Sequence, residues 1–572
     1  MRFSLSLHRQ ILLDFPSSSW LYHSGTSAIA ASSLLEELHW NESQLGQVQS
    51  AFFVGYALTQ VFGGVLGGRT STTDVAAVVN GSNFIDIDDG SDNININIDT
   101  ATTTQKQMFR RILPLSLILT GITTLLFPMA AMAGPNWAIL DRFSLGLLEG
   151  VLLPAAMAGV SSTTAATAIA TTTSSSSSTD EIFTSDDTIT TILTKRKHSN
   201  TPNNRDIKAT ASAIVIAGCY LGSAWAYLSA WIIFSESSQV HLAQWGLLQH
   251  DSSSAPSVWP LLFYVNGFLS LVVTVLFLGE FDLSVWKNNN GNGTMNSSKQ
   301  YHESTDTISS ITMAIMDDAI AIVKETLSSK SGRAIVAAQI GQGALLYSIA
   351  SWGPLYLERI ADVSTITATV VDSSSSSSLP LVSSTAVAAS IAASSLVVPQ
   401  ITQALIGMSI GVGADKLSTT IGSRLTRRSL QFISGIGPAM ILLYLGSASS
   451  SGDGAMFQSP ALLFGAAQTI SAISLGAVSV SHLEVATPSK AGAVYALGNV
   501  FAAISGSITV TLFGVLLDKD HGQQQVATAA ASDFSLPFQI VAILSVAGSI
   551  FYSLSIESDI EIGMQETKKH LQ

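Results

Sequence analysis

The sequence predicts an all-α protein that crosses a membrane many times, and three observations carry this prediction. Of the 572 residues, 47% are hydrophobic and only 11% are charged, whereas a soluble chain of this size is about a quarter charged. The mean hydropathy is +0.41. The charges gather in certain segments, and the apolar stretches between them have about twenty residues, the helical length that crosses a bilayer core of about 30 Å.

Eleven stretches meet this length, and each predicts one transmembrane helix. They lie at roughly 45–67, 112–132, 138–160, 211–234, 259–279, 334–357, 381–412, 431–447, 459–481, 490–516 and 536–556. Residues 1–44 contain no comparable span, because the stretch from Ile11 to Leu35 is interrupted by Asp14, Pro16 and His23. This segment could be a degenerate first helix, a targeting peptide or a mis-assembled gene start.

The segments between the spans differ in composition from the spans themselves. Residues 70–106, 161–208, 282–308 and 364–380 are low-complexity stretches rich in Ser, Thr, Asn or Asp, and we expect them to be disordered.

Residues 309–328, in the central loop, form an amphipathic pattern, with Ile311, Ile315, Ala319 and Ile322 on one stripe. This pattern predicts a helix that lies along the membrane surface, and a partner-binding helix is the alternative.

The positive charges predict the topology. Most of the 26 Lys and Arg lie in alternate loops and in the C-terminal tail, whereas the other set of loops holds Arg359 and Lys519. By the positive-inside rule the C-terminus is cytosolic. An N-terminus on the same side requires a twelfth span before residue 45, so Ile11–Leu35 is interpreted as the descendant of a true helix.

This organisation gives two six-helix bundles, at 45–281 together with the first helix and at 333–572, joined by a central cytosolic loop at 282–332. It is the layout of the major facilitator fold, in which two bundles rock around a site at the membrane midplane.

Short motifs occur in order along the chain. They are Q-S-A-F-F-V-G-Y at 49–56, R-x6-E-G-V-x-L-P at 142–154, Y-L-G-S at 220–223, W-P-L-L-F-Y at 259–264, W-G-P-L-Y at 352–356, G-I-G-P-A at 435–439 and H-x-E-x-A-x-P at 482–488. In these motifs the chain resembles the anion:cation symporter branch of the major facilitator superfamily, which includes plant and algal phosphate/anion transporters, vesicular glutamate transporters and sialin. The resemblance covers residues 27 to about 556 and implies an anionic substrate.

The chain also departs from that family at three positions. Gly68-Arg69 stands where the family has Asp-Arg, in a loop that latches the two halves on the cytosolic side. His23 aligns with an arginine of the first helix, and Gln342 stands where the family often has His or Arg. The cationic groups that would hold an anion are therefore depleted.

Arg142 and Glu149 are the strongest candidates for residues that bind the substrate and the coupling ion. Seven residues are nearly two helical turns, so both side chains lie on one face, about 10 Å apart along the axis. Each charge inside a span costs roughly 2.5–3.5 kcal/mol and therefore normally faces a cavity or a partner. The functional interpretation is that Arg142 binds the anion and Glu149 takes up a proton or senses the coupling cation. The alternative is an ion pair that only fixes helix packing, with Asp141 as a further partner.

Other polar residues in or near the spans are weaker candidates. His482 and Glu484 could form a gate or proton relay, or could be a solvated helix end. The remaining candidates could line a cavity with hydrogen-bonding groups, or could be helix-packing contacts. They are Gln49, Tyr56, Tyr220, Gln342, Trp352 and Asn499.

An enzymatic function is not expected. Residues 407–411 spell G-x-S-x-G around Ser409, but this motif needs a strand–turn–helix context and here lies in an apolar helix. The sequence has no zinc-ligand spacing, P-loop, dinucleotide-binding motif or basic stripe for nucleic acid. The single cysteine, Cys219, is expected to be a small packing residue.

We therefore expect a multi-pass membrane protein that acts as a secondary carrier of inorganic phosphate or a small organic anion, coupled to Na⁺ or H⁺. No cofactor beyond the coupling ion is expected, and the chain is expected to be monomeric in the bilayer. The alternative is a non-transporting, receptor-like protein derived from the same fold, which the degenerate first helix and the missing charges favour.

Overall fold

The structure is a computed structural model, and it describes residues 26–80, 98–161, 208–244, 258–280, 313, 315–371, 384–451, 459–521, 534–557 and 562. The expected low-complexity segments lie mainly outside these ranges, as does His23 of the expected first helix.

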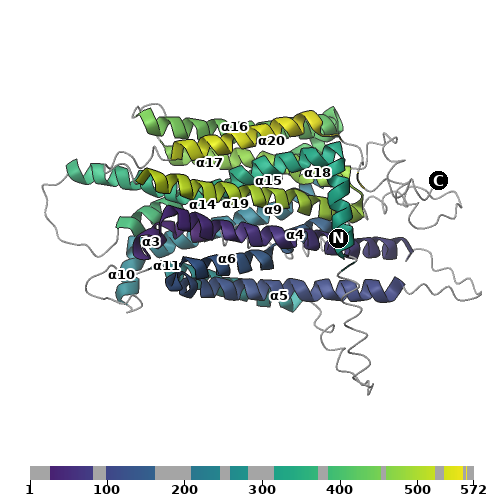
Figure 1. The fold of residues 1–572 in the computed structure, drawn as a ribbon, viewed down its shortest axis with the longest axis horizontal. Coiled ribbons are helices and arrows are strands. Elements are labelled where there is room, and N and C mark those ends of the chain that lie inside the picture. The colour runs from purple at the N-terminus through teal and green to yellow at the C-terminus, as the bar shows by residue number, and fades with distance from the viewer. Residues whose placement is uncertain are drawn as a thin grey trace, which may run out of the picture.

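The described chain is helical almost throughout, and its helices run side by side (Figure 1). In chain order they are α3 (Ala31–Glu37), α4 (Glu42–Asn80), α5 (Ile98–Ala133), α6 (Pro135–Glu149), α9 (Lys208–Phe234), α10 (Glu236–Gln244), α11 (Trp259–Glu280), α14 (Lys330–Val371), α15 (Ser384–Ile421), α16 (Ser423–Ser451), α17 (Pro460–Ser471), the 3₁₀ segment η2 (Ala472–Gly476), α18 (Val478–Val485), α19 (Pro488–His521) and α20 (Ser535–Ser555).

Within the described ranges, eleven helical stretches are long and apolar enough to cross a membrane, and they coincide with the eleven predicted spans. Tight turns reverse the chain between some of them: Gly134, at a φ of 126°, precedes Pro135 of α6, and Gly422, at a φ of 87°, separates α15 from α16. We call the end of the molecule with Gly422 the basic end, because the Lys- and Arg-rich loops are predicted there. The end with Gly134 is the opposite end.

Some helices are longer than the spans predict. Residues 70–80 continue α4 and residues 98–106 begin α5, so part of the segment expected to be disordered is helical. The physical reason is cooperativity: once a span has nucleated a helix, each further residue adds one backbone hydrogen bond.

The spans form two bundles that meet along two helix pairs. α4 of the N-terminal bundle packs on α19 of the C-terminal bundle, and α9 packs on α15. Both contacts are close because glycine replaces a side chain: a Cβ on Gly64 would lie 2.8 Å from the Cα of Ala493, and one on Gly411 would lie 2.7 Å from the Cβ of Ala213. Small residues thus allow the two bundles to approach closely at both pairs.

The described part of the first helix is much shorter than a span. Residues 26–29 and α3 are helical, and the side chains from Ala28 to Leu34 are buried. This segment contacts α4, α14 and α15, and the Glu37 carboxylate accepts a hydrogen bond from the indole Nε1 of Trp259 at 3.1 Å. The degenerate first helix therefore still lies between the bundles.

The span that begins at Pro460 is interrupted, which the sequence did not predict; it is the tenth span when the degenerate first helix is counted as the first. After α17 the chain continues as the 3₁₀ segment η2, turns at Ala477 (φ −127°, ψ −103°) and resumes as α18. Irregular backbone at membrane depth is tolerated where it is buried in protein, and Gly476 is enclosed by Ile410, Ala414 and Leu430.

The predicted amphipathic helix is present at 315–328. Ile315 and Ile322 are buried, whereas Asp317 and Lys324 are exposed. The helix is fixed to the start of α19 by the Glu325–Lys490 ion pair at 3.0 Å, at the basic end of the bundles.

Candidate functional site

Arg142 is buried inside the N-terminal bundle. Its side chain is 1% exposed, and its guanidinium lies 3.8 Å from the ring centroid of Phe127 in α5 and 5.3 Å from that of Phe263 in α11. A desolvated cation over an aromatic face gains about 2 kcal/mol or more, which offsets part of the cost of burying the charge. The two rings therefore hold the guanidinium in place.

Glu149 lies on the same face of α6, as the spacing predicts, and its side chain is also 1% exposed. It interacts electrostatically with Arg142 and with Tyr56 of α4. α6 lies this close to α4 because Gly146 and Gly150 have no side chains: a Cβ on Gly150 would lie 2.4 Å from the Tyr56 carbonyl oxygen. The carboxylate thus lies between Arg142 and the boundary of the two bundles.

Four buried tyrosines meet at that boundary, and we call them the tyrosine cluster: Tyr56 (α4), Tyr220 (α9), Tyr347 (α14) and Tyr495 (α19). Tyr347 and Tyr495 interact electrostatically with each other and with both Tyr56 and Tyr220, and Cys219 interacts with all four. The cluster draws two helices from each bundle, so it occupies the central interface.

Asn499 extends the tyrosine cluster. Its Nδ2 donates to the hydroxyl of Tyr56 at 3.4 Å, which links α19 to α4 across the interface. Of the predicted polar candidates, the structure therefore brings Tyr56, Tyr220 and Asn499 together.

Gln49 and Trp352 lie nearer the opposite end. The Gln49 side chain is buried on α4, and its amide has no hydrogen-bond partner among the described residues. The Trp352 indole donates to the Val510 carbonyl at 3.0 Å and stacks on Phe513. Trp352 thus packs between helices, whereas the Gln49 amide can still donate and accept hydrogen bonds.

Gln342 forms hydrogen bonds with the tenth span at its interruption. Its Nε2 donates to Ser474 Oγ at 3.0 Å and to the Ser471 carbonyl at 3.4 Å. Gln403 of α15 adds a bond to Ser471 Oγ at 3.2 Å. These amides stabilise the polar groups around the helix break.

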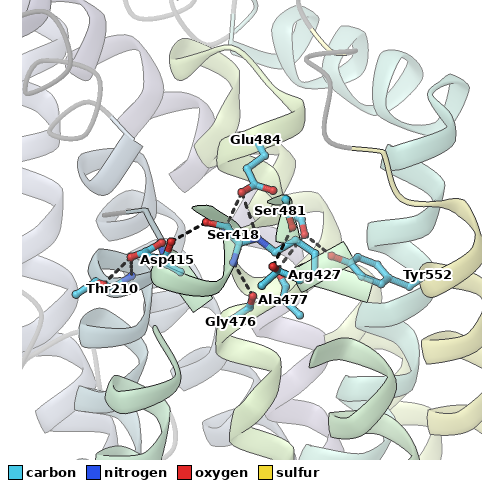
Figure 2. Close-up of polar contacts among 12 residues, drawn as sticks. Thr210, Asp415, Ser418, Arg427, Gly476, Ala477, Ser481, Glu484 and Tyr552 are labelled. Carbon is cyan, nitrogen blue, oxygen red and sulfur yellow. Dashed lines mark hydrogen bonds and ion pairs between the residues drawn. The ribbon is translucent and has the colours of Figure 1, made fainter. Parts of the chain in front are cut away.

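Asp415 forms a contact between the bundles at the basic end (Figure 2). This α15 carboxylate accepts from the backbone N–H of Ala209 at 3.0 Å, from that of Thr210 at 2.8 Å and from the Thr210 hydroxyl at 2.6 Å. The first N–H groups of a helix have no intrahelical partner, so Asp415 caps α9 from the other bundle.

Arg427 lies in α16, the helix that follows the one carrying Asp415, and connects the two sides of the helix break. Its Nη1 donates to the Gly476 carbonyl at 2.8 Å, and its Nη2 and Nε contact Glu484 Oε1 at 2.7 and 3.1 Å. Figure 2 shows this pair between α16 and α18. Glu484, predicted as a gating residue, is therefore held in a largely buried ion pair.

His482 is enclosed rather than solvated. Its side chain is 1% exposed, and its ring centroid lies 4.9 Å from that of Tyr495. The interpretation as a solvated helix end is therefore wrong for His482, because α18 is packed between α9, α14 and α19. The imidazole adjoins the tyrosine cluster instead.

The opposite end has its own contact between the bundles. Arg359 Nη2 of α14 lies 2.7 Å from Glu42 Oε1 at the start of α4, and both side chains are largely buried. Arg359 also lies 5.6 Å from the ring centroid of Phe534. Each end thus carries a charged contact between the bundles, and the tyrosine cluster lies between them.

Gly68 explains one departure from the family pattern. A Cβ at this position would lie 2.3 Å from the Ser489 carbonyl oxygen of α19, so no aspartate fits here in this arrangement. At the basic end α4 and α19 make backbone contact, and the carboxylate that joins the bundles is Asp415.

The sequence patterns did not indicate Asp415, Tyr347 or Tyr495, and Arg427 and Arg359 counted only among the basic residues that predict the topology. One signal was available: Gly411-x-x-x-Asp415-Lys416 places the acid at the end of a span, among basic residues.

The G-x-S-x-G motif lies inside α15. Ser409 Oγ donates to the Leu405 carbonyl at 2.8 Å within the same helix, and Gly411 packs on α9. The motif therefore lies in a helix, as expected, and its glycines allow close packing. Cys219 is likewise buried, as expected.

Solved structures of membrane transporters share this fold. The proton:xylose symporter XylE bound to 6-bromo-6-deoxy-D-glucose matches with a TM-score of 0.51 and 12% identity over 100% of both chains. A bacterial homologue of the human lysosomal transporter Spinster, inward-facing and unoccupied, matches with a TM-score of 0.51 and 12% identity over 96% of both chains. No family model matches the chain, and no curated protein matches it.

The fold is therefore that of the major facilitator superfamily, the superfamily to which the XylE structure is assigned. With eleven membrane-spanning helices among its described residues, the chain is a multi-pass integral membrane protein.

Proposed function

We propose that this protein is a secondary active transporter that moves inorganic phosphate or a small organic anion by alternating access, coupled to Na⁺ or H⁺. The observation that carries the proposal is the buried pair of Arg142 and Glu149, two charges that a membrane protein retains at a cost of roughly 2.5–3.5 kcal/mol each. The pair adjoins a polar cluster at the interface of two bundles, where transporters of this kind bind their substrates.

The contacts between the bundles fit alternating access. At the basic end Asp415 caps α9, and at the opposite end Arg359 pairs with Glu42. Access from either side requires one of these contacts to separate while the other holds. Both are polar contacts of few atoms, so each can be exchanged for water as its end opens.

Arg142 supplies the positive charge for the anion in this proposal, and Glu149 supplies a group that a proton or Na⁺ can neutralise. Because Glu149 interacts with both Arg142 and Tyr56, a change in its charge is felt at the anion site and at the bundle interface. This is the coupling that a symporter needs. Tyr220, Asn499, Gln49 and the amide of Gln342 are the proposed hydrogen-bonding groups for the substrate.

The test is uptake by the purified protein in proteoliposomes. Labelled phosphate, glutamate and ascorbate are offered with and without Na⁺ and proton gradients. We expect gradient-driven uptake of at least one anion, a loss of at least about tenfold in Arg142→Ala, and loss of gradient dependence in Glu149→Gln.

Matched controls are Arg333→Ala and Glu36→Gln, which change the same residue types at exposed positions and should transport normally. Transport that persists unchanged in both Arg142→Ala and Glu149→Gln would refute the mechanism. Specific binding without any flux would instead favour the receptor-like alternative.

A further inference from the structure

A residue of the C-terminal tail is bonded to the linker between α18 and α19. Ile562 forms a parallel bridge with Ala486: its N–H donates to the Val485 carbonyl at 3.0 Å, and its carbonyl accepts from the Thr487 N–H at 3.2 Å. Its side chain is 0% exposed and belongs to the main hydrophobic core. A buried residue that makes two backbone hydrogen bonds, seven positions beyond the end of α20, is a specific attachment.

The start of the tail is attached as well. The Glu557 N–H donates to Ser331 Oγ at 3.1 Å, and its carboxylate lies 3.0 Å from Lys330 Nζ and 3.9 Å from Arg424 Nη2. Arg428 donates to the Ile556 carbonyl at 3.1 Å.

We call Ile556, Glu557 and Ile562 the tail strap. Ile556 and Glu557 contact the starts of α14 and α16, and Ile562 contacts the linker that follows α18.

The linker follows α18, the half-helix after the break in the tenth span. α18 begins after the turn at Ala477, where the regular backbone hydrogen bonding is interrupted, and ends at Val485, whose carbonyl accepts from Ile562 of the tail strap. Between these two points α18 carries His482 and Glu484 and packs on α9 of the other bundle.

We propose that the tail strap is a built-in restraint on α18, which keeps the basic end closed until the strap is released. With the strap attached, the Val485 carbonyl is bonded and α18 stays against α9. With the strap detached, the turn at Ala477 acts as a hinge, Arg427 is the remaining clamp on α18, and the half-helix moves away from α9 more often. The closure of the basic end can be measured without a substrate, so the proposal does not depend on which substrate the protein carries.

The chain carries its own reporter for this motion. Cys219 is its single cysteine and is buried at the tyrosine cluster, on the helix against which α18 packs. Alkylation of a buried cysteine by a water-soluble maleimide follows the fraction of molecules in which the interface is open.

The variant Ile562→Pro removes the N–H that bonds to Val485, and Ile562→Val keeps both the N–H and a branched side chain. Loss of one buried backbone hydrogen bond corresponds to a population change of about fivefold. We expect Cys219 in the full-length purified protein to be alkylated about fivefold faster in Ile562→Pro, and at the normal rate in Ile562→Val.

A second variant tests the proposal independently if Ile562→Pro fails to fold. Glu557→Lys places a positive charge beside Lys330 and Arg424 and leaves every backbone bond in place, and it should also speed alkylation. If either folded variant is alkylated at the normal rate, the proposal is overturned. It is also overturned if alkylation rises only when the helical circular dichroism signal falls, because global unfolding would then expose Cys219.

Discussion

Asp415→Asn is the most direct test of the contact between the bundles at the basic end. In the structure Asp415 Oδ1 accepts from Ala209, and Oδ2 accepts from both the N–H and the hydroxyl of Thr210. Asparagine keeps one carbonyl oxygen and replaces the other oxygen with an NH₂ donor. The Thr210 hydroxyl can pair with either group, because a hydroxyl both donates and accepts, but one of the two backbone N–H groups then faces the NH₂ without an acceptor. The size of the side chain is preserved, while one backbone hydrogen bond and the negative charge are lost.

The magnitude follows from these contacts. A buried backbone N–H left without an acceptor costs about 1–3 kcal/mol, and a negative charge at a helix N-terminus contributes about 0.3–1 kcal/mol. The closed basic end should therefore be weakened by about 2 kcal/mol, which lowers the ratio of closed to open molecules about 30-fold. Because Thr210 stays on α9, the loss applies to the contact between the bundles and not to the folding of either helix.

The assay is the rate of Cys219 alkylation in purified protein, with Asp317→Asn on the exposed face of helix 315–328 as the matched control. We expect a rate increase of at least about tenfold in Asp415→Asn and none in the control. A rate within twofold of that of the unmodified protein would refute the inference that Asp415 holds the basic end closed.

Two further predictions concern other contacts in the fold. Gly146→Ala should lower the free energy of unfolding by about 1–3 kcal/mol, because the new Cβ would lie 2.1 Å from the Phe52 carbonyl oxygen. Gly413→Ala is the control and should leave the free energy of unfolding unchanged, because nothing lies within 4 Å of its Cβ. Thermal unfolding in detergent compares the two variants. Arg359→Gln should break the ion pair with Glu42 and speed the alkylation of Cys219 by reagent that enters from the opposite end of the molecule. The test applies the reagent to sealed vesicles that hold the protein in either orientation. Faster alkylation from the basic end would contradict the prediction.

The spans could be predicted because their signal is local. About twenty apolar residues between charged segments are sufficient to specify a transmembrane helix, whatever its neighbours are. The break in the tenth span has no such signal, because residues 471–477 contain neither proline nor charge and its stabilising partners, Gln342 and Arg427, come from other helices.

The site could be predicted only in part, for a related reason. Arg142 and Glu149 were found because a charge inside an apolar span stands out. Asp415 and Arg427 were not, since a charge at the end of a span resembles any topology signal until the rotation of its helix and the identity of its partner are known. Tyr347 and Tyr495 are apolar enough to pass for packing residues until α14 and α19 are brought together.

The glycines of α4 have a mechanical consequence. Gly55 faces α6, Gly63 faces Val151 just beyond the end of α6, and Gly64 and Gly68 face α19. Backbone therefore meets backbone on two sides of one helix. Side chains that interlock as ridges in grooves fix the angle between helices, whereas surfaces without ridges let one helix slide and tilt on another with few rotamer changes. α4 thus presents flat backbone surfaces both to its own bundle and to α19 of the other bundle, and a single side chain at Gly64 would push α4 and α19 apart.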